Sequence, residues 1–134
     1  MTEEKYPVVF DEVIRIKLQK AIEKSEFKKI IINWLDELEC NGPISGKLLD
    51  NHLWLYEMKN KHPPLRLYFY HQKSTNKIII FECEMKTSEQ KQQKTINKVK
   101  NRLTKFLNLY GCIPCFLNFL KHPEAVYRAA YFLK

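Results

Sequence analysis

The stretch LRLYFYHQKSTNKIIIFECEM, residues 65–85, decides the fold. Two runs within it, residues 65–72 and 77–83, are rich in the aromatic and branched residues that favour strands, and the polar residues 74–76 separate them. A third run of the same kind, residues 53–59, precedes them across a His-Pro-Pro segment. We therefore predict three consecutive antiparallel strands.

Alternation along residues 65–70 assigns side chains to the two faces of this predicted sheet. One face carries Leu65, Leu67 and Phe69, and the other carries Arg66, Tyr68 and Tyr70. We expect the apolar face to pack on the core and the polar, aromatic face to contact a ligand.

A short strand and two helices are predicted before this sheet. Residues 6–10 form a short apolar run that contains Pro7 and suits an edge strand. Apolar residues recur with helical spacing over residues 13–22, although residues 13–18 (VIRIKL) also alternate, and again over residues 26–40. Asn41-Gly42-Pro43 supplies a stop signal, so the two helices form a hairpin.

A long basic helix is predicted after the sheet. Thr87 and Gln90 have the spacing of a capping box, and Gly111 is placed to end the helix. A later Pro123 is expected to open a short last helix. The predicted fold class is thus α+β, with an N-terminal helical hairpin on a small antiparallel sheet, then a basic helix and an apolar C-terminal segment.

Length and composition predict one folded domain over residues 1–134. The chain is 45% hydrophobic and 28% charged, which suits a globular core and excludes fibrous or disordered classes. Its apolar stretches are far shorter than the roughly 20 residues of a membrane span, and no signal peptide is evident. We expect a cytoplasmic protein.

The four cysteines are interpreted mainly as buried free thiols. Cys112 and Cys115 form a C-x-x-C pair with His122 nearby, which leaves a zinc or redox role open as a weaker reading. Cys40 and Cys83 stand alone in the sequence. We predict no metal and no cofactor.

Positive charge is concentrated in residues 59–105, which carry twelve Lys or Arg against three acids, a net of +9 for a chain with a net charge of +8. Such a segment favours a polyanionic partner, nucleic acid above all. Two alternatives to nucleic acid remain open. In the first, the lysines only solvate the exposed face of the helix at residues 91–105. In the second, ranked below it, the positive segment binds a membrane surface.

The order of these segments resembles the RelE/ParE/HigB toxin superfamily, and most of all its HigB-type, phage-derived branch. The similar segments are NGPISGKLLDNHLWLYEMK (residues 41–59), LRLYFY (65–70) and IIIFECEMK (78–86), followed by the basic helix. The resemblance covers about residues 8–108. Residues 109–134 lie beyond it, and we expect this aromatic-rich tail to pack on the domain or to form a homodimer or antitoxin interface.

The resemblance implies a toxin of a type II toxin-antitoxin system that cleaves ribosome-bound mRNA without a metal, by attack of the RNA 2′-OH on the adjacent phosphate. It implies a cognate antitoxin as the second partner. Matching the motifs position by position gives Lys59, Arg66 and Lys86 as candidate catalytic residues. Fixed cations suit this reaction because its transition state gathers negative charge on the phosphate.

Further residues are candidates for binding RNA, by charge or by stacking on bases: Lys91, Lys94, Lys98, Arg102, Tyr68, Tyr70 and His71. The chain departs from the family at two places. Thr87 stands where a second basic residue is usual, and Gln92, Gln93 and Lys94 stand where the RelE branch has a tyrosine. A group for proton transfer must therefore come from elsewhere.

Two other functions stay open. The chain can act like the ParE branch on a protein target such as DNA gyrase, or it can be an RNA-binding module without activity. Arg66 can also be purely structural, paired with Glu57 or Glu82 across the sheet.

Overall fold

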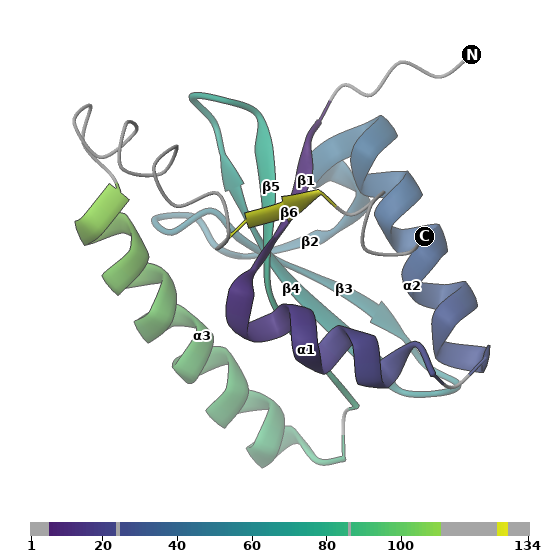
Figure 1. Cartoon of the computed structure of the whole chain (residues 1–134). Coiled ribbons are helices and arrows are strands. Elements are labelled where there is room, and N and C mark those ends of the chain that lie inside the picture. The colour runs from purple at the N-terminus through teal and green to yellow at the C-terminus, as the bar shows by residue number, and fades with distance from the viewer. Residues whose placement is uncertain (1–5, 24, 86, 111–125, 129–134) are drawn as a thin grey trace.

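The computed structural model describes residues 6–23, 25–85, 87–110 and 126–128. In this part of the chain, three α-helices surround a six-stranded sheet of order β2-β3-β4-β5-β1-β6 (Figure 1). The strands are β1 (Val8–Asp11), β2 (Lys47–Asp50), β3 (Leu55–Asn60), β4 (Leu65–Gln72), β5 (Lys77–Met85) and β6 (Val126–Arg128). The helices are α1 (Glu12–Ala21), α2 (Ser25–Asn41) and α3 (Glu89–Tyr110), with a short 3-10 helix, η1 (Gly42–Ser45).

The predicted meander is confirmed, because β3, β4 and β5 pair antiparallel in sequence order. The prediction of an all-antiparallel sheet is wrong, because β1 lies parallel to β5. The chain leaves β1 through α1 and α2 and reaches β5 only after β2, β3 and β4, so this pairing depends on residues far apart in the sequence. The strand β2 was not predicted, since its four residues show no clear alternation.

The helical hairpin is confirmed, with strand β1 ahead of it as expected from residues 6–10. Helix α2 ends at Asn41, and Gly42 follows with a φ of +69°, a conformation that glycine adopts without strain. A Cβ atom at Gly42 would also lie 2.5 Å from the ring of Tyr6. The stop predicted at residues 41–43 therefore combines backbone freedom with close packing.

Two apolar cores lie on opposite faces of the sheet (Figure 1). The first core joins α1 and α2 to one face, and it includes the predicted core residues Leu65, Leu67 and Phe69. The second core joins α3 to the other face and includes Tyr68 and Tyr70. The prediction that the second face is open to a ligand is therefore wrong for these tyrosines, because α3 covers them.

Helix α3 begins one residue later than predicted. The side-chain oxygen of Ser88, rather than that of Thr87, accepts a hydrogen bond from the backbone N–H of Lys91, at 3.2 Å. Ser88 thus caps the helix, since its oxygen satisfies a backbone N–H in the first turn.

The C-terminal segment is described only at residues 126–128, where a strand takes the place of part of the predicted last helix. This strand, β6, pairs antiparallel with β1 and so occupies its outer edge. The free N–H and C=O groups of an edge strand favour such pairing over a short isolated helix. The predicted roles of Gly111, Pro123 and the remaining tail lie outside the described residues.

The described cysteines, Cys40 and Cys83, are free thiols, as predicted. Burial of Cys83 raises the pKa of its thiol to about 12, so the group stays protonated at neutral pH. Cys112 and Cys115 lie outside the described residues. Within the described part, none of the helices combines the length and apolar character needed to cross a membrane.

Candidate functional site

A cavity of about 350 Å³ lies between the sheet and the first turns of α3. It contains two of the three candidate catalytic residues, Lys59 on β3 and Arg66 on β4. The third, Lys86, lies outside the described residues. The cavity is lined by Lys47, Leu49, Glu57, Lys59, Arg66, Glu89, Gln92, Gln93 and Ile96.

Lys59 and Arg66 are brought together by the register of the sheet. They are directly opposed residues of β3 and β4, so their side chains leave the same face. Lys59 is exposed, whereas the side chain of Arg66 is only 14% exposed. The site therefore combines a solvated cation with a mostly buried one.

Arg66 is held by a carboxylate from the neighbouring strand. Its Nη1 atom donates a hydrogen bond to Oε1 of Glu57 at 2.9 Å, and the side chain of Glu57 is only 7% exposed. The other oxygen of Glu57 accepts a hydrogen bond from Nε2 of Gln92 on α3, at 3.0 Å. The pairing of Arg66 with Glu57, anticipated as a structural alternative, is thus present in this state of the protein.

Two further polar side chains lie beside this pair. The hydroxyl of Tyr68 is buried, and burial together with the negative charge of Glu57 raises its pKa, so the phenol is neutral at physiological pH. On β5, Glu84 stands opposite Arg66 and accepts a hydrogen bond from Thr95 of α3 at 2.7 Å. The sheet beneath the first turns of α3 therefore carries two carboxylates and one guanidinium.

The aromatic candidates for RNA binding are not accessible. Tyr68 is fully buried, and the ring of Tyr70 packs edge-on against Phe106 with centroids 6.2 Å apart. His71 is buried at the other end of β4, beside Tyr6, and burial lowers its pKa. Core packing encloses all three rings in this structure, and the stacking of Tyr68 and Tyr70 on bases and the RNA contact of His71 stay predictions.

The basic candidates on α3 divide into two groups. Lys91, Lys94 and Lys98 are exposed and free to face a polyanion.

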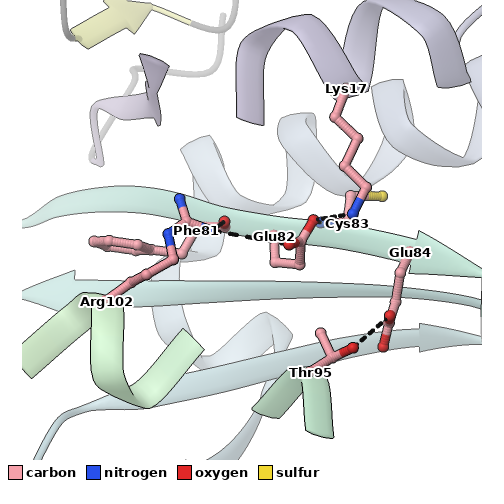
Figure 2. Close-up of polar contacts among 7 residues, drawn as sticks. All are labelled: Lys17, Phe81, Glu82, Cys83, Glu84, Thr95 and Arg102. Atoms are coloured by element: carbon pink, nitrogen blue, oxygen red, sulfur yellow. Dashed lines mark hydrogen bonds and ion pairs between the residues drawn. The ribbon is translucent and has the colours of Figure 1, made fainter. Parts of the chain in front are cut away.

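Arg102 instead turns inward, donating from Nη1 to the backbone oxygen of Phe81 at 3.0 Å and lying 3.8 Å from Oε2 of Glu82. On the opposite side of the strand, Nζ of Lys17 on α1 donates to Oε1 of Glu82 at 2.6 Å (Figure 2). Lys17, Glu82 and Arg102 thus form a structural link between α1, β5 and α3, which we call the clamp. The prediction that Arg102 binds RNA is not supported.

Sequence reasoning gave no catalytic or RNA-binding role to the cavity residues Lys47, Glu57 and Gln92, although it named Glu57 as a structural partner of Arg66. Glu57 could have been found, because it alternates with Lys59 along the same strand and must share its face. Lys47 lies on the strand that was not predicted. Nothing in the sequence separates Gln92 from Gln93.

A second cavity of about 350 Å³ adjoins the first on the side of α2. Lys47, Glu57 and Lys59 line both cavities, and the remaining lining residues of the second are Trp34, Glu37, Ser45, Gly46 and Met58. Trp34 is otherwise a buried core residue.

Comparisons of the sequence with protein-family models and with curated proteins find no match. Among solved structures, the chain is similar to one described as the crystal structure of the isolated E. coli RelE toxin. The two share 14% sequence identity with a TM-score of 0.46, over 70% of this chain and 98% of that chain. Similarity at this level assigns no function.

Proposed function

We propose that the protein is a toxin of the RelE/ParE/HigB type, related most to the HigB-like branch, and that it cleaves mRNA on the ribosome without a metal. The observation that supports this is one cavity in which Lys59 and Arg66, two of its cations, share the space with the buried carboxylate of Glu57. These are the group types that phosphodiester cleavage by an internal 2′-OH requires.

In the proposed reaction, Glu57 accepts the proton of the RNA 2′-OH, and the 2′-oxygen attacks the adjacent phosphorus. The bond to the 5′-oxygen of the next nucleotide breaks, and that oxygen takes up a proton from water. The products are a 2′,3′-cyclic phosphate and a 5′-OH end. Arg66 and Lys59 stabilise the charge that gathers on the phosphate, and Lys86 offsets charge on the leaving group.

Arg66 must exchange partners during this reaction. In the structure its Nη1 donates to Glu57, and in the complex a phosphate oxygen takes that place. Because the exchange frees the carboxylate at the moment the phosphate arrives, substrate binding and activation of the base are linked.

The exposed lysines Lys91, Lys94 and Lys98 extend the positive surface along α3 and supply contacts to the backbone of mRNA or ribosomal RNA. We propose a cytoplasmic protein of one domain whose cognate antitoxin covers the cavity. Residues 109–134 belong in this proposal to an antitoxin or homodimer interface.

The test is cleavage of mRNA on programmed ribosomes by wild-type protein and by Arg66→Ala and Glu57→Gln. We expect each variant to lose a factor of roughly a hundred or more in rate, with product ends as stated above. The matched control is Lys61→Ala, an exposed lysine two residues after Lys59 that does not line the cavity, with a change of less than about twofold. A wild-type protein that cleaves no mRNA contradicts the proposal.

A second function is favoured by the same ion pair. With Glu57 bound to Arg66, the cavity can hold its cations without cleaving, and the protein then acts as an RNA-binding module or, like the ParE branch, on a protein target such as DNA gyrase. Steep salt dependence of RNA affinity without cleavage distinguishes the RNA-binding alternative.

A further inference from the structure

Two adjacent glutamines at the start of α3 have different surroundings. Nε2 of Gln92 donates to Oε2 of Glu57, 35 residues earlier in the chain, at 3.0 Å. Nε2 of Gln93 donates to Oδ1 of Asn97, one turn further along the same helix, at 3.1 Å. Gln92 is half-buried and Gln93 is exposed, so only Gln92 links the helix to the carboxylate in the cavity.

The pairing of Arg66 with Glu57 is incomplete. An arginine and a carboxylate commonly form two parallel hydrogen bonds, one to each oxygen. Here a single bond is present, from Nη1 to Oε1, and the buried Nε of Arg66 has no hydrogen-bond partner among the described residues. Oε2 of Glu57, to which a second parallel bond from Arg66 would run, instead accepts from Nε2 of Gln92 on the other side of the cavity, and this bond draws it toward α3.

We propose that Gln92 is a positioning residue, which holds the Glu57 carboxylate away from a two-bond pairing with Arg66 and so keeps both groups ready to act on RNA. This inference rests on the proposed function. An amide is suited to the task because it donates a hydrogen bond without neutralising the carboxylate, as a lysine or arginine would. Oε2 of Glu57 keeps a second lone pair for the proton of the 2′-OH.

Removal of the Gln92 amide has a specific consequence. Oε2 of Glu57 loses its donor in a mostly buried site, and Nη2 of Arg66, whose N–H runs parallel to that of Nη1 in the guanidinium, is a charged donor that can replace it. The carboxylate then closes onto Arg66 with two bonds. The base is held more tightly and the cation is neutralised, so the chemical step slows.

The experiment compares Gln92→Leu with Gln90→Leu in the full chain, measuring kcat and KM on programmed ribosomes. We expect kcat to fall about tenfold or more for Gln92→Leu, in line with the loss of a hydrogen bond to a charged group. KM should change less than about threefold, because Lys59 and the exposed lysines of α3 still hold the RNA. Gln90 is an exposed glutamine of the same first turn that does not line the cavity, and Gln90→Leu should leave both constants within about twofold of wild type.

A second measurement separates positioning from a general effect on the fold. In the Glu57→Gln background, which retains residual activity from the cations, Gln92→Leu should have less than about twofold further effect, because the group that it positions is gone. An undiminished loss in that background overturns the inference, as do equal losses at residues 92 and 90 or an effect confined to KM. Absence of cleavage by the wild-type protein is a distinct result, which contradicts the proposed function and this inference together.

Discussion

The two halves of α3 rest on the same sheet in different ways. In the C-terminal half, Leu103 is fully buried, and the ring of Phe106 lies edge-on to Phe81 at 5.5 Å. In the N-terminal half, Gln92 and Thr95 donate hydrogen bonds to sheet carboxylates. The C-terminal half thus contacts the sheet mainly through apolar side chains, and the N-terminal half contacts it through hydrogen bonds.

This difference between the two halves of α3 indicates which part of the helix stabilises the fold and which part orients the site. Apolar contacts are non-directional and favour the folded state by the area that they bury. Buried hydrogen bonds to carboxylates contribute little net stability, but they fix the orientation of the groups that they join. We therefore expect the C-terminal half of α3 to hold the helix in place and the N-terminal half to set the geometry of the site.

The largest effect is expected for Leu103→Ala in the apolar half. The substitution leaves a cavity beneath α3 and should lower the free energy of unfolding by about 3 kcal/mol. Urea denaturation measures this change, with the exposed neighbour Asn101→Ala as control at within about 0.5 kcal/mol. Equal changes at residues 101 and 103 would show that the apolar half does not anchor the helix.

A smaller loss, about 2 kcal/mol, is expected for Glu82→Gln at the clamp between α1 and α3. The carboxylate is mostly buried and lies against Lys17 and Arg102 from opposite sides of β5 (Figure 2). The expected loss in the free energy of unfolding is no larger because the side chain of Lys17 is 53% exposed, so water solvates its charge when the carboxylate is removed. Glu23→Gln, at an exposed carboxylate, is the control. If Glu82→Gln lowers the free energy of unfolding no more than Glu23→Gln does, Glu82 does not link α1 to α3.

Thr95→Val should lower the free energy of unfolding by only about 1 kcal/mol, because it removes one hydrogen bond to Glu84 while keeping the shape of the side chain. The same helix offers a matched threonine. The hydroxyl of Thr104 donates to the backbone oxygen of Lys100 at an exposed position, and Thr104→Val should cost less than about 0.5 kcal/mol. A Thr95→Val loss as large as that of Leu103→Ala would remove the distinction between the halves.

The smallest effect concerns His71, a buried polar group beside the first core. Burial lowers its pKa below the ordinary value of 6.5, so the unfolded chain binds the proton more readily than the folded one. The free energy of unfolding should fall as the pH falls from 7 to about 5.5, and His71→Gln should flatten this slope. The exposed His62→Gln should leave the slope unchanged, and a slope that persists without His71 assigns the titration to another group.

Local patterns predicted most of the elements. The alternation in residues 65–72 matches β4 residue for residue, and the stop at residues 41–43 coincides with the end of α2. Where prediction failed, a distant partner decided the outcome. The direction of β1 depends on β5, and the strand at residues 126–128 depends on the free edge of β1.

The candidate site shows the same division. Lys59 and Arg66 could be placed on one face from the strand pattern alone, because the side chains of opposed residues in paired strands leave the sheet together. The strand pattern could not predict the burial of Tyr68 or the inward turn of Arg102, because both depend on where α3 lies on the sheet.

The sequence by itself determined the order of helices and strands and the concentration of positive charge, since both are properties of short segments and of composition. Only the tertiary structure decided that Glu57 is joined to both Arg66 and Gln92, and that Gln93 instead bonds to Asn97 on its own helix. The physical reason is that hydrogen bonds between distant segments depend on distance and orientation across the fold, which no local pattern encodes.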